Sequence, residues 1–442
     1  MEPAAHIDRK IWGIAWPAIL SNLSIPLLGL VDSAILGHLG NSRYLAAVAV
    51  GAALLSFLYW GFSFLRMGTT GLVARAEGAG DRDGSVLVLL RSAVLALLLA
   101  TLVLALHPLL IGAGLALMSP AVELHGLAES YARIRIYSAP AVLLTYTVVG
   151  WFIGRQDTRS PMLIVILTNL ANIALDFLLV VGLDMRSDGA ALATVIAEYL
   201  GCAVALACVH YQLRGFHPRR LVGRLRDISA YTHLLRSNRH LFVRTVCLLF
   251  GFAFFTAQGE NLGSEIVAAN TLMMHLLLMA AYGLDGFAYA AEGMSGHQLG
   301  GRDLAGFYAV VRRCALWSAG CAACLSAGLL VLQPLFVTVL TDLDALRTLM
   351  RTYYPWLIAM PLLAAPAYLL DGVFIGASET RQMMLTMLFS LCCVYLPLWY
   401  LTLPMGNHGL WLSFTAFNIA RGITLYRRYR RMSRLGLWLP AA

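Results

Sequence analysis

The sequence holds few charged residues and a single lysine. Charged side chains make up 12% of its 442 residues, whereas a soluble domain carries about 25% because its surface must face water. Hydrophobic residues reach 60%, and Lys10 is the lone lysine among 32 basic residues. Most of such a surface has to face lipid, so the composition excludes a soluble globular protein and predicts an integral membrane protein.

Sequence patterns of enzymes, metal centres and nucleic-acid binding are also missing. There is no P-loop, no H-E-x-x-H and no G-x-S-x-G motif, so we expect neither enzymatic activity nor a cofactor or resident metal. The eight cysteines lie in apolar runs without zinc-ligand spacing, which predicts packing inside the protein rather than disulfides or metal binding. The net charge of +9 comes without a basic aromatic stripe, so we expect no nucleic-acid partner.

What the sequence does contain is a series of long apolar runs. About 20 apolar residues cross a bilayer core, and twelve such stretches predict twelve transmembrane helices. Their approximate limits are 11–37, 45–70, 86–113, 122–151, 161–183, 188–213, 241–261, 266–295, 307–332, 346–375, 382–404 and 408–429.

Arginine gathers in alternate gaps between these spans. By these limits, gaps after even-numbered spans hold thirteen arginines, gaps after odd-numbered spans hold two, and basic residues also occur in both tails. Cytoplasmic loops attract positive charge, so both termini and all the even gaps are predicted to be cytoplasmic. The first span is too long for a signal peptide, and we expect no processing.

The sequence also repeats itself at half its length. Residues 150–162 return as residues 372–384, with seven of thirteen positions identical. The same offset of 222 positions pairs Gly78 with Gly300 and Asp81 with Asp303. A duplicated membrane chain is typical of a transporter.

The duplication predicts two lobes with the same orientation in the membrane. We expect a six-helix lobe over residues 1–213, a basic cytoplasmic linker over 214–240, and a second six-helix lobe over 241–442. Six spans per half is an even number, so both halves insert alike and are related by a pseudo-two-fold axis along the membrane normal, with a cavity between them. Without a nucleotide-binding motif, transport by rocking of these lobes would run on an ion gradient.

Ionisable side chains at bilayer depth are costly and are functional candidates by default. Asp32 lies deep in the first span, with no basic residue within two helical turns along the chain. Asn169, Asn172 and Asp176 are spaced i, i+3, i+7, which places them on one face of the fifth span. Further polar candidates are Thr194 on the sixth span and Tyr131 or Tyr137 on the fourth. Such a cluster can hold a proton or a sodium ion; the alternative is an interhelical hydrogen-bond seam that serves stability alone.

The first span also contains Pro17 and Pro26, which precede Asp32. Proline removes a helical hydrogen bond and favours a bend, so these residues are candidates for coupling Asp32 to cavity shape. Prolines are also common in membrane helices without such a role. Arg66, Arg133 and Arg135 are expected near span ends, with their side chains reaching the membrane surface.

The second half has its own buried acids, namely Asp285 and Glu292 on the eighth span and Asp371 on the tenth. Arg244 and His275 are nearby in the chain as possible partners. Either the acids form a second cation or substrate site, or they lock the lobe through ion pairs. The available partners favour the structural role.

Four segments together carry a family resemblance. They are Pro-Leu-Leu-Gly-Leu-Val-Asp-Ser-Ala-Ile-Leu-Gly-His-Leu-Gly around Asp32, Asn169-x-x-Asn172-x-x-x-Asp176, Gly189-Ala-Ala-x-Ala-Thr194, and Leu-Asp-Gly-Phe-Ala-Tyr around Asp285. With them the whole chain resembles the multidrug and toxic compound extrusion (MATE) family, and more narrowly its DNA-damage-inducible, DinF-like branch.

The resemblance implies an exporter of cationic, amphiphilic drugs and dyes in a bacterial inner membrane, exchanging them for H⁺ or Na⁺. It implies that Asp32 is the cation-coupling residue, that Asn172, Asp176 and Thr194 match further polar positions, and that Pro17 is the bending proline. Sodium, if used, would bind at Asp32, Asn172 and Asp176. Beyond substrates and membrane lipids we expect no partner, and a monomer.

This sequence departs from the family in two respects. Some proton-coupled members have a tyrosine one turn before the first-helix aspartate, where this chain has Leu28, and the fourth span has no matching asparagine. The hydrogen-bond network is thinner than in those members, so H⁺ and Na⁺ both stay open. The alternative function is a flippase for a lipid-linked precursor, which would need several cationic residues in its cavity to hold a phosphate. Here the deep ionisable residues are mostly acidic, which favours cationic cargo.

Overall fold

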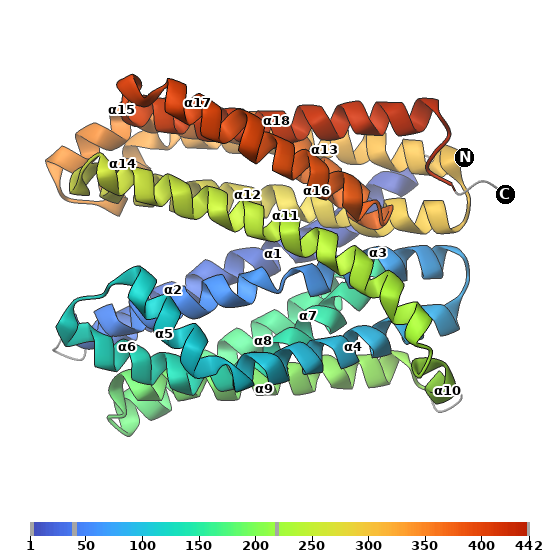
Figure 1. The fold of residues 1–442 in the computed structure, drawn as a ribbon, viewed down its shortest axis with the longest axis horizontal. Helices are drawn as coiled ribbons and strands as arrows, with labels where there is room; N and C mark the ends of the chain where they lie inside the picture. The colour runs from blue at the N-terminus through green and yellow to red at the C-terminus, as the bar shows by residue number, and fades with distance from the viewer. Residues whose placement is uncertain (1–3, 38–41, 217–220, 440–442) are drawn as a thin grey trace. The chain divides into compact units, whose positions relative to one another are not determined.

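The computed structural model describes residues 4–37, 42–216 and 221–439, and all regular structure there is helical (Figure 1). Eleven helical spans in these ranges are long and apolar enough to cross a membrane. The twelfth predicted span, 408–429, corresponds to α18 (Asn407–Arg434), which is 28 residues long and more polar than the others. The predicted all-α class is confirmed, and each predicted span coincides with one helix or with consecutive helices.

Several spans are built from consecutive helical segments. The first half contains α1 (Ala4–Gly37), α2 (Ser42–Gly61), α3 (Phe64–Gly78), α4 (Arg82–Ala105), α5 (His107–Met118), α6 (Val122–Arg135), the 3-10 turn η1 (Ile136–Ser138), α7 (Ala139–Gly154), α8 (Arg159–Asp176), the π-helical η2 (Phe177–Gly182) and α9 (Arg186–Gln212). The second half contains α10 (Val222–Leu225), α11 (Ile228–Asn261), α12 (Ser264–Gly300), α13 (Leu304–Val331), α14 (Gln333–Leu340), α15 (Asp344–Gly376), α16 (Thr380–Phe389), the π-helical η4 (Ser390–Tyr395), α17 (Leu396–Leu401), the 3-10 turn η5 (Leu403–Met405) and α18.

Proline marks several of these segment boundaries. Proline lies in the first turn of α5, α7, α14 and α17, where its missing N–H leaves no helical hydrogen bond unmade. In contrast, α15 continues through three internal prolines. The helix α1 is likewise continuous from Ala4 to Gly37 and contains both Pro17 and Pro26.

The chain forms two compact units. The N-terminal unit comprises residues 20–73 and 81–234, and the C-terminal unit comprises residues 1–19, 74–80 and 235–442. Two segments from the first half of the sequence, residues 4–19 of α1 and 74–80 at the end of α3, thus belong to the C-terminal unit among its described residues. Consequently α1, α3 and α11 each contribute residues to both units.

The C-terminal unit is organised around α15. This helix packs against α12, α13 and α18, and its inward face is almost completely buried. The core beside it is rich in aromatic residues, including Tyr395, Trp411, Phe414 and Phe417, all at most 2% exposed. Large rings bury much apolar surface, so this core contributes strongly to the packing of the unit.

The N-terminal unit is built from helix pairs. The helix α9 packs against α6, α7 and α8, while α2 packs against α6 and α4 against α7. Buried apolar clusters lie around Trp151 and Phe152 on α7 and around Ile35 and Leu36 on α1. These pairings bring α1, α6, α8 and α9 around the acidic residues described below.

The sequence repeat is also a structural repeat. Gly150 and Gly154 of α7 pack directly on the backbone of α3, and their counterparts Gly372 and Gly376 of α15 pack on the corresponding turns of α12. A Cβ atom on any of these glycines would overlap the neighbouring helix. Glycines four residues apart allow membrane helices to approach closely, so each half contains the same helix pair.

The N-terminal caps of two helices repeat as well. Asp81 accepts a hydrogen bond from the backbone N–H of Gly84 at 2.8 Å and caps α4, and Asp303 accepts one from Gly306 at 2.9 Å and caps α13. An N-cap of this kind contributes about 1 kcal/mol. The repeated sequence positions therefore encode helix starts as well as helix packing.

Within the C-terminal unit, Gly78 and Gly300 form a reciprocal contact. A Cβ atom on Gly78 would meet the carbonyl of His297, and one on Gly300 would meet the carbonyl of Arg75. His297 follows Arg75 by the repeat offset of 222 residues, as Gly300 follows Gly78. The ends of α3 and α12 thus touch through equivalent atoms on both sides.

The expectation that the cysteines pack inside the protein is wrong for three of them. Cys324, Cys392 and Cys393 are exposed on their helices, whereas Cys202, Cys247 and Cys314 are buried, and all eight are free thiols. An apolar run in a membrane chain has a lipid-facing side as well as a buried one, and the sequence does not distinguish them.

Candidate functional site

Two carboxyl groups come together in the N-terminal unit. Asp32 of α1 is half-buried and Asp176, the last residue of α8, is 2% exposed, and their side chains lie within hydrogen-bonding reach of each other. The π-helical segment η2 begins directly after Asp176. Such π segments are frequent at functional sites, because the wider turn redirects side chains and frees backbone groups.

The carboxyl pair has few donors around it. Both oxygens of Asp176, one oxygen of Asp32 and the side-chain oxygen of Asn172 are buried and receive no hydrogen bond from the described residues. Buried acceptors of this kind are costly when they are left unsatisfied. A proton shared by the carboxyl groups, or a cation among the oxygens, would satisfy them.

Asn172 and Thr194 join the site as expected. The side-chain amide of Asn172, which is 1% exposed, donates to the Thr194 hydroxyl at 3.3 Å, and that hydroxyl donates to the carbonyl of Ala190 at 3.0 Å. Asn172 is thereby oriented with its oxygen free of donors. These bonds connect α8 to α9 one turn before Asp176.

Asn169 lies on the same helix face but contacts a different residue. Its amide donates to the hydroxyl of Ser24 at 3.0 Å and approaches the Ser24 carbonyl at 3.3 Å. Asn169 contacts Ser24, and Asp176, which is later on α8, approaches Asp32, which is later on α1. The helices α1 and α8 therefore run in the same direction over this stretch. The structure therefore brings Asn169 to α1 two turns away from the carboxyl pair.

Tyr131, Arg135 and Glu198 complete the surroundings of Asp32. Tyr131 is 4% exposed, and both Tyr131 and Arg135 are close enough to Asp32 to interact with it electrostatically. Arg135 also pairs with Glu198 of α9 at 3.2 Å. Tyr137, the other tyrosine considered from the sequence, is exposed.

The expectation that Arg135 reaches the membrane surface is wrong. Its side chain is only 14% exposed and turns to Glu198, while Arg133 is exposed and pairs with Glu129 at 2.6 Å. The sequence contains one signal that could have found this arginine, since Tyr131 and Arg135 are one helical turn apart and share a face. Its partner Glu198 is an acid within the sixth span and is not among the site residues predicted from the sequence.

Pro17 and Pro26 lie on either side of the point where α1 passes from one compact unit to the other. Residues up to Ile19 belong to the C-terminal unit, and residues from Leu20 belong to the N-terminal unit. Pro17 is buried and Pro26 is half-buried. Asp32 follows on the same helix, within the N-terminal unit.

The C-terminal unit contains a separate ionic cluster. Asp371 of α15 accepts hydrogen bonds from Arg244 of α11 and, at 2.8 Å, from Arg421 of α18. Arg421 also donates to the side-chain oxygen of Asn418 at 3.0 Å. All three charged side chains are less than 10% exposed. This geometry is the ion-pair lock that the sequence offered as one of two readings, with Arg421 as an additional partner.

The other acids of this unit lie on α12. Glu292 is 1% exposed, and Asp285 is half-buried near Tyr282 and Tyr368. His275, named from the sequence as a possible partner of the acids, is exposed and its Nδ1 lies 2.8 Å from the carbonyl of Thr271. In the described residues no group of three or more His, Cys, Asp or Glu side chains is arranged to hold a metal ion.

Comparison with known proteins relates the whole chain to membrane transporters. The MatE family model matches residues 17–178 and 241–401, one stretch in each half. DNA damage-inducible protein F of Escherichia coli is 39% identical over 98% of this chain and 94% of its own length. Protein DETOXIFICATION 44, chloroplastic, of Arabidopsis thaliana is 27% identical over 84% of this chain and 73% of its own length.

A solved structure gives the same result for the fold. The Vibrio cholerae MATE transporter VcmN matches 98% of both chains with a TM-score of 0.82 at 20% identity. Together with the helices described above, this confirms the predicted fold of twelve membrane helices in two six-helix lobes. It also confirms that the chain is a multi-pass membrane protein.

Proposed function

The chain belongs to the MATE family of multidrug and toxic compound efflux transporters, and on that premise we propose that it exports cationic amphiphilic molecules in exchange for protons. The proposal includes a location in a bacterial inner membrane with both termini in the cytoplasm, since arginine gathers in the gaps that would lie there. The chain would work as a monomer and need no cofactor.

The carboxyl pair of Asp32 and Asp176 is the observation that favours the proton over sodium as the coupling ion. Two carboxyl groups within hydrogen-bonding reach form a bond only when one of them holds a proton, because two carboxylates repel each other. The described residues offer these oxygens almost no other donor. A proton is therefore the smallest ligand that completes this site.

Loss of that proton would leave two negative charges side by side in an apolar surrounding. A cationic substrate relieves this repulsion, and a returning proton displaces the substrate in turn. Both ligands compete for the same negative charge, which is the requirement for exchange of one for the other. Arg135, held by Glu198 next to Asp32, would offset part of the negative charge and prevent the site from binding cations too tightly.

The helix α1 would transmit the protonation state. It carries Asp32 in the N-terminal unit and contributes residues 4–19 to the C-terminal unit, with Pro17 and Pro26 on either side of the change. A helix weakened by two prolines bends at lower cost than an uninterrupted one. Altered packing of Asp32 against Asp176 would thereby reach both units.

A pH gradient can drive this exchange. When one proton is exchanged for one monovalent cation no net charge crosses the membrane, so each unit of pH difference supplies about 1.4 kcal/mol, or about a tenfold concentration ratio. A second proton per substrate would add the membrane potential, about 2.3 kcal/mol at 100 mV. No nucleotide hydrolysis is required.

Efflux of a fluorescent cationic dye in inverted vesicles tests the proposal. We expect dye movement under an imposed pH gradient and none under a sodium gradient alone, and we expect Asp32→Asn to abolish it without loss of folded protein. Asp342→Asn, which changes an exposed carboxylate, is the matched control and should transport normally. Movement driven by sodium alone would replace the proton with Na⁺, and movement insensitive to both gradients would refute the exchange mechanism.

A further inference from the structure

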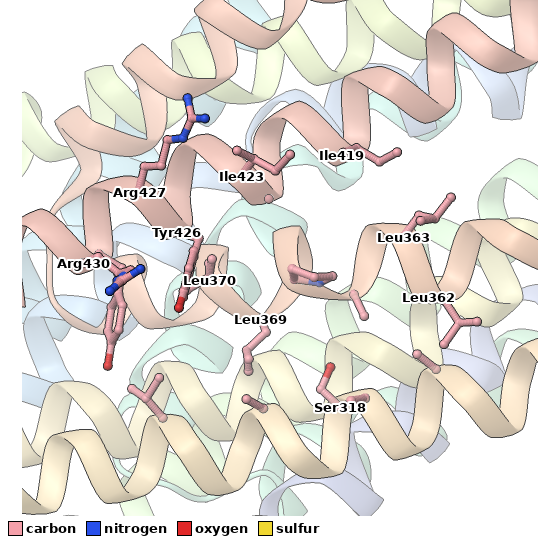
Figure 2. Close-up of a pocket in the computed structure, with 18 residues that line it drawn as sticks. Ser318, Leu362, Leu363, Leu369, Leu370, Ile419, Ile423, Tyr426, Arg427 and Arg430 are labelled. Carbon is pink, nitrogen blue, oxygen red and sulfur yellow. The ribbon is translucent and has the colours of Figure 1, made fainter.

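An apolar groove runs along the outside of the C-terminal unit, between α13, α15 and α18 (Figure 2). Its volume is about 740 Å³. Leu362 and Ile423 on its walls are 49% and 47% exposed, so the groove is open to the surroundings of the helices. In a membrane protein those surroundings are the lipid chains.

The groove exists because α13 and α18 both pack along α15 while small residues line the space between them. Ala315 and Ala319 on α13 leave room that larger side chains would fill, and Gly422 lets α18 pack closely on Pro366 of α15. Leu362 and Leu369 of α15 add apolar side chains to its lining. The result is an open groove with the chemistry of a hydrocarbon chain.

One end of the groove is strongly basic. Figure 2 shows Arg427 and Arg430 together at this end, beside Tyr426. They also line an adjoining hollow of about 480 Å³ with Arg431 and Arg434. The four arginines are spaced i, i+3, i+4, i+7, so they share one face of α18. All four are exposed, and within the described ranges no carboxylate lies within ion-pair distance of them.

We propose that this groove binds an anionic glycerophospholipid, with an acyl chain between α13 and α18 and the phosphate on the arginines. An apolar channel that ends in four guanidinium groups matches a molecule with a long hydrocarbon chain and a negative head. Basic pockets between membrane helices on the cytoplasmic side bind anionic lipid head groups, and guanidinium forms paired hydrogen bonds with phosphate oxygens.

The same layout excludes the exported cation as the occupant. A cationic drug would enter a field of four positive charges that no described carboxylate neutralises, whereas the carboxyl pair of the N-terminal unit offers it the opposite charge. The groove is therefore a lipid site that is separate from transport chemistry. Its occupancy would fill the gap between α13 and α18 and fix them against α15.

The test is thermal unfolding of the full chain in detergent, with phosphatidylglycerol, phosphatidylcholine of the same chains, or inorganic phosphate added. We expect phosphatidylglycerol alone to raise the unfolding temperature. Arg427→Gln combined with Arg430→Gln should weaken its binding about 30-fold, at about fivefold per arginine. Ala319→Phe, which places a ring into the open groove, should abolish the effect, and Arg381→Gln, an exposed arginine elsewhere, should leave it unchanged.

Each other outcome overturns the proposal. An equal rise in unfolding temperature with phosphatidylcholine would show that the head group is not recognised. An equal rise with inorganic phosphate would show a simple anion site. An unchanged lipid effect in the double arginine variant would place the lipid elsewhere. If Ala319→Phe fails to fold, native mass spectrometry of lipids retained by the double arginine variant decides, and undiminished retention of phosphatidylglycerol refutes the assignment.

Discussion

Substitution of Asp371 by asparagine should destabilise the C-terminal unit severely. The carboxylate holds two arginines, Arg244 and Arg421, whose side chains are 8% and 3% exposed. Without it two guanidinium groups stay buried next to each other with no compensating charge at that point. Removal of one partner from a buried ion pair costs about 3–5 kcal/mol, and the lost hydrogen bonds are included in this value.

Comparison with a second variant separates the charge effect from the loss of contacts. Arg421→Gln leaves the neutral pair of Asp371 and Arg244 in place, and it loses charged hydrogen bonds to Asp371 and Asn418. The remaining ion pair should limit the loss, so Arg421→Gln should be less damaging than Asp371→Asn.

Unfolding followed by tryptophan fluorescence in detergent measures both variants. One kcal/mol shifts the unfolding temperature by about 2–4 °C in a unit of this size, so Asp371→Asn should lower it by about 10 °C. Asp342→Asn, whose carboxylate is fully exposed beside Arg347, should change it by less than about 2 °C, since surface ion pairs contribute little. If Asp371→Asn unfolds with the parent protein but loses transport, Asp371 is a transport residue and not a structural lock.

Three further predictions have defined outcomes. Asn172→Ala should reduce dye transport at least tenfold with little change in unfolding temperature, whereas Asn169→Ala should cost about 1 kcal/mol and leave most transport; equal transport in the two would contradict the separation of these residues. Gly300→Ala should destabilise by about 1–3 kcal/mol through overlap with the α3 backbone, and Gly320→Ala, which meets open space, should be neutral; equal unfolding temperatures would refute the close contact. Burial raises the pKa of Glu379 above its usual range against two nearby arginines, so its stabilising contribution is present below the unfolded pKa and lost as pH rises through the folded one. Glu379→Gln should therefore gain in unfolding temperature over the parent as pH rises above the usual pKa of glutamate, and a constant difference would disprove this.

The helices and their internal repeat could be predicted because they depend on local chemistry. Membrane spans follow from apolar length alone, and Asp81 and Asp303 cap helices through a backbone group three residues away. The glycine pairs at 150–154 and 372–376 likewise act at fixed spacing. Features of this kind are complete within a short stretch of sequence.

Packing between distant helices could not be predicted in the same way. The outward position of Cys392 and the assignment of residues 4–19 to the C-terminal unit depend on which side of an apolar helix faces lipid, and both sides are apolar. The ion pair of Arg135 and Glu198 joins helices 63 residues apart in sequence. An arginine near a helix end is compatible with either a membrane surface or a buried acid as its partner, and only the tertiary structure distinguishes the two.

The reciprocal contact of Gly78 and Gly300 bears on the origin of the chain. Gly78 meets His297 and Gly300 meets Arg75, and these two partners occupy equivalent positions of the repeat. Such mutual contacts between equivalent positions are the pattern of an isologous interface in a symmetric homodimer. A free six-span half would thus be able to pair with its own copy through this surface. In such a dimer every mutation appears twice, so a carboxylate like Asp32 would be present in both copies. Joining the copies into one gene removes that restriction, because one half can have Asp32 while the other has Phe254 at the position 222 residues later.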